Sequence, residues 1–93
     1  MTAIDVACQS SADGWTCDVT VADDDSRSRH MVRVHRADLA RLDPAAVDPS
    51  DLVLRSFAFL HRHEPQESIL ASFDLPLIGR YFPEFETEIR RSR

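Results

Sequence analysis

The stretch "IDVACQSSADGWTCDVTV", Ile4 to Val21, decides the fold of the N-terminal part of this 93-residue chain. Apolar and polar residues alternate on both sides of "SSADG", which is the period of a strand with one buried face. Asp13-Gly14 is a turn signal, because glycine tolerates positive φ. A turn centred on the two residues before Gly14 would bring six residues into three facing pairs on the buried face. These pairs are Ile4 with Val21, Val6 with Val19 and Cys8 with Cys17.

Beyond this hairpin, "DDDSRSR" (Asp23–Arg29) predicts a polar loop. The alternation then resumes, and His30–Arg36 is predicted as a third strand with Val32 and Val34 facing inward. The simplest arrangement of the three strands is an antiparallel β-meander over about residues 3–36.

The apolar period changes to that of a helix after residue 36, and all five prolines lie beyond residue 43. A short helical turn is predicted in "ADLARL" (37–42). Asp48 and Pro49 form a helix start, as N-cap and first residue of a core helix. That helix should end near His63, because Pro65 disfavours helical geometry in the residue before it.

The remaining prolines and Asp74 introduce further short helices. We therefore expect one domain, residues 1–93, of the α+β class. It consists of a three-stranded antiparallel β-meander followed by four or five short helices, about residues 37–91, packed on one face of the sheet.

Composition excludes several classes of protein. The chain is 43% hydrophobic with a net charge of −5, which is typical of a globular domain and argues against a general polyanion binder. No apolar run approaches the roughly 18–20 residues that cross a bilayer. The first residues, "MTAIDVAC", lack the basic and apolar regions of a secretory signal, so we expect a cytoplasmic protein.

The segment "SFAFLHRHEPQESILASFDLPLIGRYFPEF" (Ser56–Phe85) resembles the C-terminal part of an uncharacterised family of small bacterial proteins. The resemblance covers about a third of the chain. It implies a bacterial protein, but it brings no known activity and no catalytic residues.

Within this segment, Glu67–Phe85 has the rhythm of a helix-turn-helix motif. A recognition helix needs basic or amide side chains, whereas residues 64–88 contain six acidic residues and only Arg80 as a base. The segment carries more apolar residues than a small domain can bury, which predicts core closure together with a protein interface. We expect a homodimer or a complex with another protein through Ile78, Arg80, Tyr81, Phe82 and Phe85.

Basic residues concentrate instead in the Arg-rich segment 27–41. An ion-paired, solvated face explains them without a ligand, and a surface for RNA or an acidic partner is the alternative. That alternative would make the chain a nucleic-acid-binding or antitoxin-like regulator. The basic patch consists of Arg27, Arg29, Arg33, His35 and Arg36.

No motif in the sequence predicts catalysis, a cofactor or a metal site. Cys8 and Cys17 lie in opposed strands without zinc-finger spacing, so we predict buried, reduced thiols, although a cross-strand disulfide is geometrically possible. His61 and His63 are two residues apart and point to different sides of a helix. The expected function is that of a small non-catalytic protein-interaction or regulatory module that self-associates.

Overall fold

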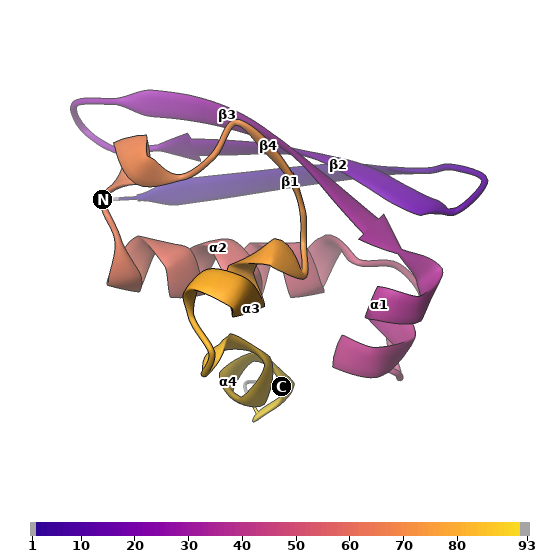
Figure 1. Cartoon of the computed structure of the whole chain (residues 1–93). Coiled ribbons are helices and arrows are strands. Elements are labelled where there is room, and N and C mark those ends of the chain that lie inside the picture. The colour runs from indigo at the N-terminus through magenta and orange to yellow at the C-terminus, as the bar shows by residue number, and fades with distance from the viewer. Residues whose placement is uncertain (1, 92–93) are drawn as a thin grey trace.

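A four-stranded sheet lies over a layer of helices in the computed structural model, which describes residues 2–91 (Figure 1). The strand order is β1-β2-β3-β4; the first two pairings are antiparallel and the pairing of β3 with β4 is parallel. The elements are β1 (Ala3–Ser10), β2 (Gly14–Ala22), β3 (Arg27–His35), α1 (Arg36–Leu42), α2 (Ser50–His63), the 3-10 helix η1 (Gln66–Ser68), β4 (Ser72–Asp74), α3 (Leu77–Tyr81) and α4 (Phe85–Arg91).

The hairpin of β1 and β2 has the predicted register in all three facing pairs. Ser11 and Gly14 close a two-residue turn by exchanging backbone hydrogen bonds of 2.7 and 3.4 Å. Position 14 requires glycine, because an added Cβ atom would lie 2.1 Å from the Val34 carbonyl oxygen on β3. The turn therefore fits under the end of the neighbouring strand only without a side chain.

Cys8 and Cys17 form a disulfide bond across this hairpin, so the prediction of reduced thiols was wrong. Reduced thiols were expected because disulfides are rare in a reducing cytoplasm. Residues 8 and 17 form a directly facing pair, and such pairs bring Cβ atoms within the reach of a disulfide. Cys17 is fully buried, whereas Cys8 lies half-buried in the edge strand.

The third strand begins at Arg27, three residues earlier than predicted. The loop before it is shorter because one Asp23 carboxylate oxygen accepts the backbone N–H groups of Asp25 and Ser26, at 2.9 and 2.8 Å. These two hydrogen bonds lower the pKa of Asp23. Arg27, Ser28 and Arg29 thus extend the ladder opposite β2.

The fourth strand was not predicted, so the sheet is mixed rather than a three-stranded meander. β4 returns from the helical part and runs parallel to β3, with Phe73 opposite Val32. Backbone hydrogen bonds join Met31 N–H to the Ala71 carbonyl (2.8 Å) and Leu75 N–H to the Arg33 carbonyl (2.9 Å).

All four α-helices lie on one side of the sheet, as predicted (Figure 1). The core helix α2 begins one residue after the predicted start. The Asp48 carboxylate accepts the Ser50 N–H at 2.9 Å, and this bond lowers the pKa of Asp48. Among residues 2–91, no helix combines the length and apolar composition that crossing a bilayer requires.

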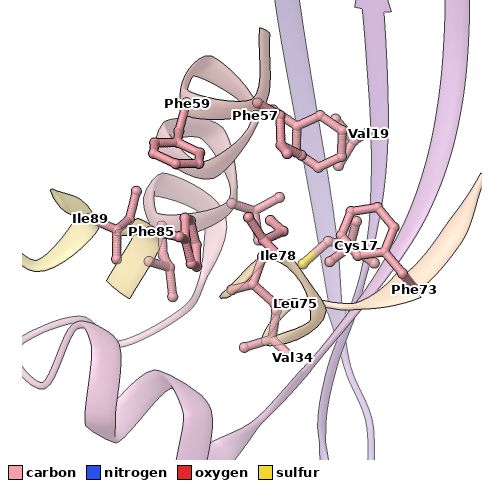
Figure 2. Close-up of a cluster of buried hydrophobic side chains, with 14 of the residues drawn as sticks. Cys17, Val19, Val34, Phe57, Phe59, Phe73, Leu75, Ile78, Phe85 and Ile89 are labelled. Carbon is pink, nitrogen blue, oxygen red and sulfur yellow. The ribbon is translucent and has the colours of Figure 1, made fainter. Parts of the chain in front are cut away.

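The core lies between α2, the inner face of the sheet and the C-terminal helices (Figure 2). Phe57 contacts the ring of His30 at 5.3 Å and that of Phe73 at 6.0 Å between centroids. Two residues further along α2, Phe59 contacts Phe85 of α4 at 5.3 Å. One helix therefore joins the sheet to the C-terminal helices.

Arg55 joins three elements at the other side of α2. Its guanidinium donates to the carboxylates of Asp43 (2.9 Å) and Asp51 (2.8 Å) and to the Ile89 carbonyl (2.7 Å). The Arg55 side chain is 15% exposed and that of Asp43 only 2%. This largely buried ion pair holds the end of α1 and the helix α4 against α2.

Candidate functional site

A cleft opens where the end of α2 faces β4 and α3. Because Pro65 follows, Glu64 leaves the helix in an extended conformation, and the chain turns through η1 toward the sheet. β4 then pairs with β3, and α3 begins at Leu77, after the turn that contains Pro76. The end of α2, the η1–β4 segment and α3 thus form three walls.

Four hydrogen bonds, one of them buried and three partly buried, fix the η1–β4 wall to the sheet. His30 Nδ1 pairs with the Leu70 carbonyl at 2.7 Å and its Nε2 with the Ser28 hydroxyl at 2.8 Å. The Gln66 side-chain amide donates to the Val21 carbonyl (3.1 Å) and to Ser28 Oγ (2.9 Å). His30 and Gln66 are both buried, and buried polar groups need hydrogen-bond partners. Both side chains find these partners within the chain and hold the η1–β4 wall in place.

The cleft has a volume of about 260 Å³ and is mainly apolar. Buried core residues form its floor, including Phe73 and Ile78, whereas Leu70 and Tyr81 stand exposed at 47% and 66% on its walls. Its polar side chains are those of Glu64, Ser68 and Tyr81. The full lining is Leu60, Glu64, Ser68, Ile69, Leu70, Phe73, Leu77, Ile78, Tyr81 and Phe82.

Negative charge borders the cleft. The Glu64 carboxylate lines it, and Glu67 follows in η1, beside the wall residue Ser68. Within residues 2–91, neither acid forms an ion pair. The cleft therefore offers an apolar interior beside uncompensated carboxylates.

The predicted interface residues divide between core and surface. Ile78 and Phe85 are 3% and 0% exposed, so both belong to the core; Ile78 reaches the surface only in the floor of the cleft, and Phe85 does not line it. This part of the prediction needs correction: one side of α3 and α4 packs under α2, and helices this short leave the side ambiguous in sequence. Phe82 is half-buried, and Arg80 and Tyr81 are exposed.

The residues of the basic patch lie on the outer sheet face or at its end, and acidic groups or an aromatic ring engage most of them. Arg33 forms an ion pair with Asp74 at 2.6 Å. Arg29 is hydrogen-bonded and ion-paired to Asp18, which raises the pKa of Arg29. The other contacts are His35 with Asp38 at 3.3 Å and Arg36 over the Trp15 ring at 5.1 Å, and Arg27 is exposed at the start of β3.

The remaining candidate residues have structural contacts. His61 Nε2 lies 3.2 Å from the Thr2 hydroxyl, and the His63 ring packs against Phe59 and Phe82, at 4.2 and 5.4 Å between centroids. Residues 2–91 contain no group of three or more His, Cys, Asp or Glu side chains that could hold a metal ion.

Sequence reasoning missed Glu64 and the buried pair His30 and Gln66. The signal for Glu64 was Pro65, which ends α2 and leaves Glu64 in an extended conformation at the cleft. His30 was placed in a strand without a role, because its partner at position 70 comes from a strand–loop segment that was not predicted.

Comparison with models of known protein families gives no match, and searches among curated proteins and solved structures find none with significant similarity.

Proposed function

We propose that this chain is a non-catalytic protein-interaction module whose cleft receives a short apolar segment of another protein. The observation that carries the proposal is the pair of exposed side chains, Leu70 and Tyr81, on the walls of an open cleft floored by core residues. Exposed aromatic residues beside an apolar depression are typical of places where a partner's side chain anchors.

The size of the cleft favours a short segment over a large flat interface or a small ligand. Stable protein interfaces use about 20–30 residues and about 800 Å² on each side, whereas ten residues line this cleft. Its volume of about 260 Å³ is also below the roughly 300–1,000 Å³ of pockets for drug-sized molecules. An amphipathic helix or extended peptide with two or three apolar anchors fits these dimensions.

Charge favours a basic partner over a second copy at this surface. Two copies meeting cleft to cleft would bring Glu64 and Glu67 near their own equivalents, which opposes association. A segment with Lys or Arg beside its apolar anchors would instead neutralise Glu64 and place a cation over the Tyr81 ring.

The nucleic-acid alternative has less support. Three members of the basic patch, Arg29, Arg33 and His35, already face carboxylates at ion-pair distance, and phosphate contacts would have to replace these pairs. We therefore do not propose this function.

The predicted cytoplasmic location remains part of the proposal. Disulfides are rare in a reducing cytosol, so the Cys8–Cys17 bond provides a test of location. Denaturing cells directly in an alkylating reagent, so that the reagent also reaches the buried Cys17, should label both cysteines if the protein resides in a reducing compartment. Protection of both would place it in an oxidising one.

Selection from a random peptide library tests the interaction function. Peptides that bind the wild-type protein should share apolar anchors and basic flanks, and should bind the Leu70→Ser/Tyr81→Ser variant at least about tenfold more weakly. Val47→Ser is the matched control, because Val47 is 90% exposed and does not line the cleft. Selected peptides that bind all three proteins alike, or a library that yields none, would contradict the proposal.

A further inference from the structure

β1 is the long open edge of the sheet. Among residues 2–91, its eight residues pair only with β2, while β4 covers part of β3 at the opposite edge. Open edges are usually protected by lysine, proline or a bulge, because their unpaired backbone groups bind other strands. β1 contains neither lysine nor proline, it pairs without a break, and Asp5 is its single charged residue.

The hydrogen-bond ladder shows which backbone groups face this edge. Ser11 and Gly14 exchange both of their hydrogen bonds, and bonded and non-bonded pairs alternate along an antiparallel ladder. Asp5 and Ala7 therefore bond to β2, whereas the N–H and C=O groups of Ile4, Val6 and Cys8 point away from it. The side chains of these three residues are half-buried on the inner face, and a further strand would cover them.

One face of α2 lies below β1, along the same open edge of the molecule. His61 is hydrogen-bonded to Thr2, just before β1, so this side of α2 borders the strand. Leu54 lies seven residues earlier on the same helix face and is 39% exposed, with the small, half-buried Ala58 nearby. The exposed edge thus combines strand backbone with an apolar helix stripe.

We propose that β1 and the Leu54–His61 face of α2 form a two-fold interface with a second copy of this chain. β1 would pair antiparallel with its equivalent to make one continuous sheet, and α2 would pack beside its equivalent underneath. This surface is separate from the cleft, so the two associations are independent.

The charge of Asp5 and the side of the sheet on which each side chain lies determine the register of this pairing. Facing residues must lie on the same side of the sheet, and a pairing centred on Asp5 would oppose two like charges. Centring on Val6 avoids this, because Asp5 then faces Ala7 of the second copy. It also places Ile4 opposite Cys8 of the second copy, so that half-buried apolar side chains cover one another. The near absence of charge on β1 and this self-complementary order favour a second copy over a foreign strand.

Sedimentation velocity across the micromolar range, combined with hydrogen exchange of single backbone amides, tests the proposal on the wild-type protein. We expect a dimer at the upper concentrations. The amides of Ile4, Val6 and Cys8 should exchange more slowly as the dimer forms, whereas those of Asp5 and Ala7 should not change. A monomer at all concentrations, or a dimer that leaves these three amides unprotected, would overturn the proposal.

A pair of variants tests the register. Ala7→Asp would face Asp5 of the second copy twice and should weaken the dimer about tenfold, whereas Ala7→Lys should dimerise as tightly as wild type or more tightly. Ala7 is exposed, and circular dichroism of both variants checks that they fold. Equal dimerisation of the two variants would overturn the proposed pairing.

Discussion

The basic patch and the cleft differ in whether their groups already have partners within the chain. On the sheet, Asp18 and Asp74 lie beside Arg29 and Arg33, so much of the positive charge is compensated. In the cleft, the Leu70 and Tyr81 side chains remain exposed and Glu64 has no ion-pair partner within residues 2–91. A cluster of one residue type is therefore a weaker sign of a binding surface than groups left unmatched by the fold.

The largest expected effect concerns the core that supports both surfaces. Phe57 packs against His30 of β3 on the inner face of the sheet and against Phe73 in the floor of the cleft. Phe57→Ala should lower the free energy of unfolding by about 3–5 kcal/mol, measured by urea denaturation. Val47→Ala, at a 90% exposed site, should change it by less than about 0.5 kcal/mol. A loss below about 1 kcal/mol for Phe57→Ala would mean that the two surfaces do not share this core.

A smaller effect on the free energy of unfolding is expected from loss of the Cys8–Cys17 disulfide, which joins β1 to β2. Replacing both Cys8 and Cys17 by serine removes a cross-link between residues nine positions apart and should cost about 2–4 kcal/mol, in the lower part of that range because the loop is short. Peptide binding at the cleft should not change. In the purified wild-type protein, an alkylating reagent should label both cysteines only after denaturation with a reductant. Labelling in denaturant alone would show that the thiols are free.

The smallest effect concerns the basic patch itself. Arg33→Ala removes an exposed ion pair with Asp74 and should change the free energy of unfolding by about 0–1 kcal/mol, less at high salt. Affinity for RNA or DNA should be negligible at physiological salt in both proteins. Tight binding by the wild type that falls steeply with added salt and weakens in Arg33→Ala would reverse the comparison between the two surfaces.

The sequence predicts the parts of the fold whose signals are local. Alternation around Gly14 specifies the register of β1 and β2, and Pro65 marks the end of α2. β4 was not predicted, because three residues are too few to show the alternation of a strand and because its partner, β3, lies about forty residues away in sequence. The inward side of α3 escaped because five residues form barely more than one turn, so burial of Ile78 depends on tertiary contacts.

The candidate site was predicted only in its general position. An apolar surplus near residues 78–85 pointed to the C-terminal helices, and Tyr81 is indeed exposed there. The opposite wall depends on the hydrogen bond between His30 and the Leu70 carbonyl, which joins residues forty positions apart. No local pattern encodes such a contact, so the shape of the cleft required the structure.

β4 also bears on how many copies of the chain can join. Without it, the sheet would present two open edges and could add strands at both, as a growing fibre does. With β3 partly covered, β1 is left as the long open edge. A protein with one such edge can pair with one further copy only. Pairing through β1 would then stop at two copies. Three residues in parallel register would thus act as a chain terminator, and their loss should turn a closed pair into an open polymer.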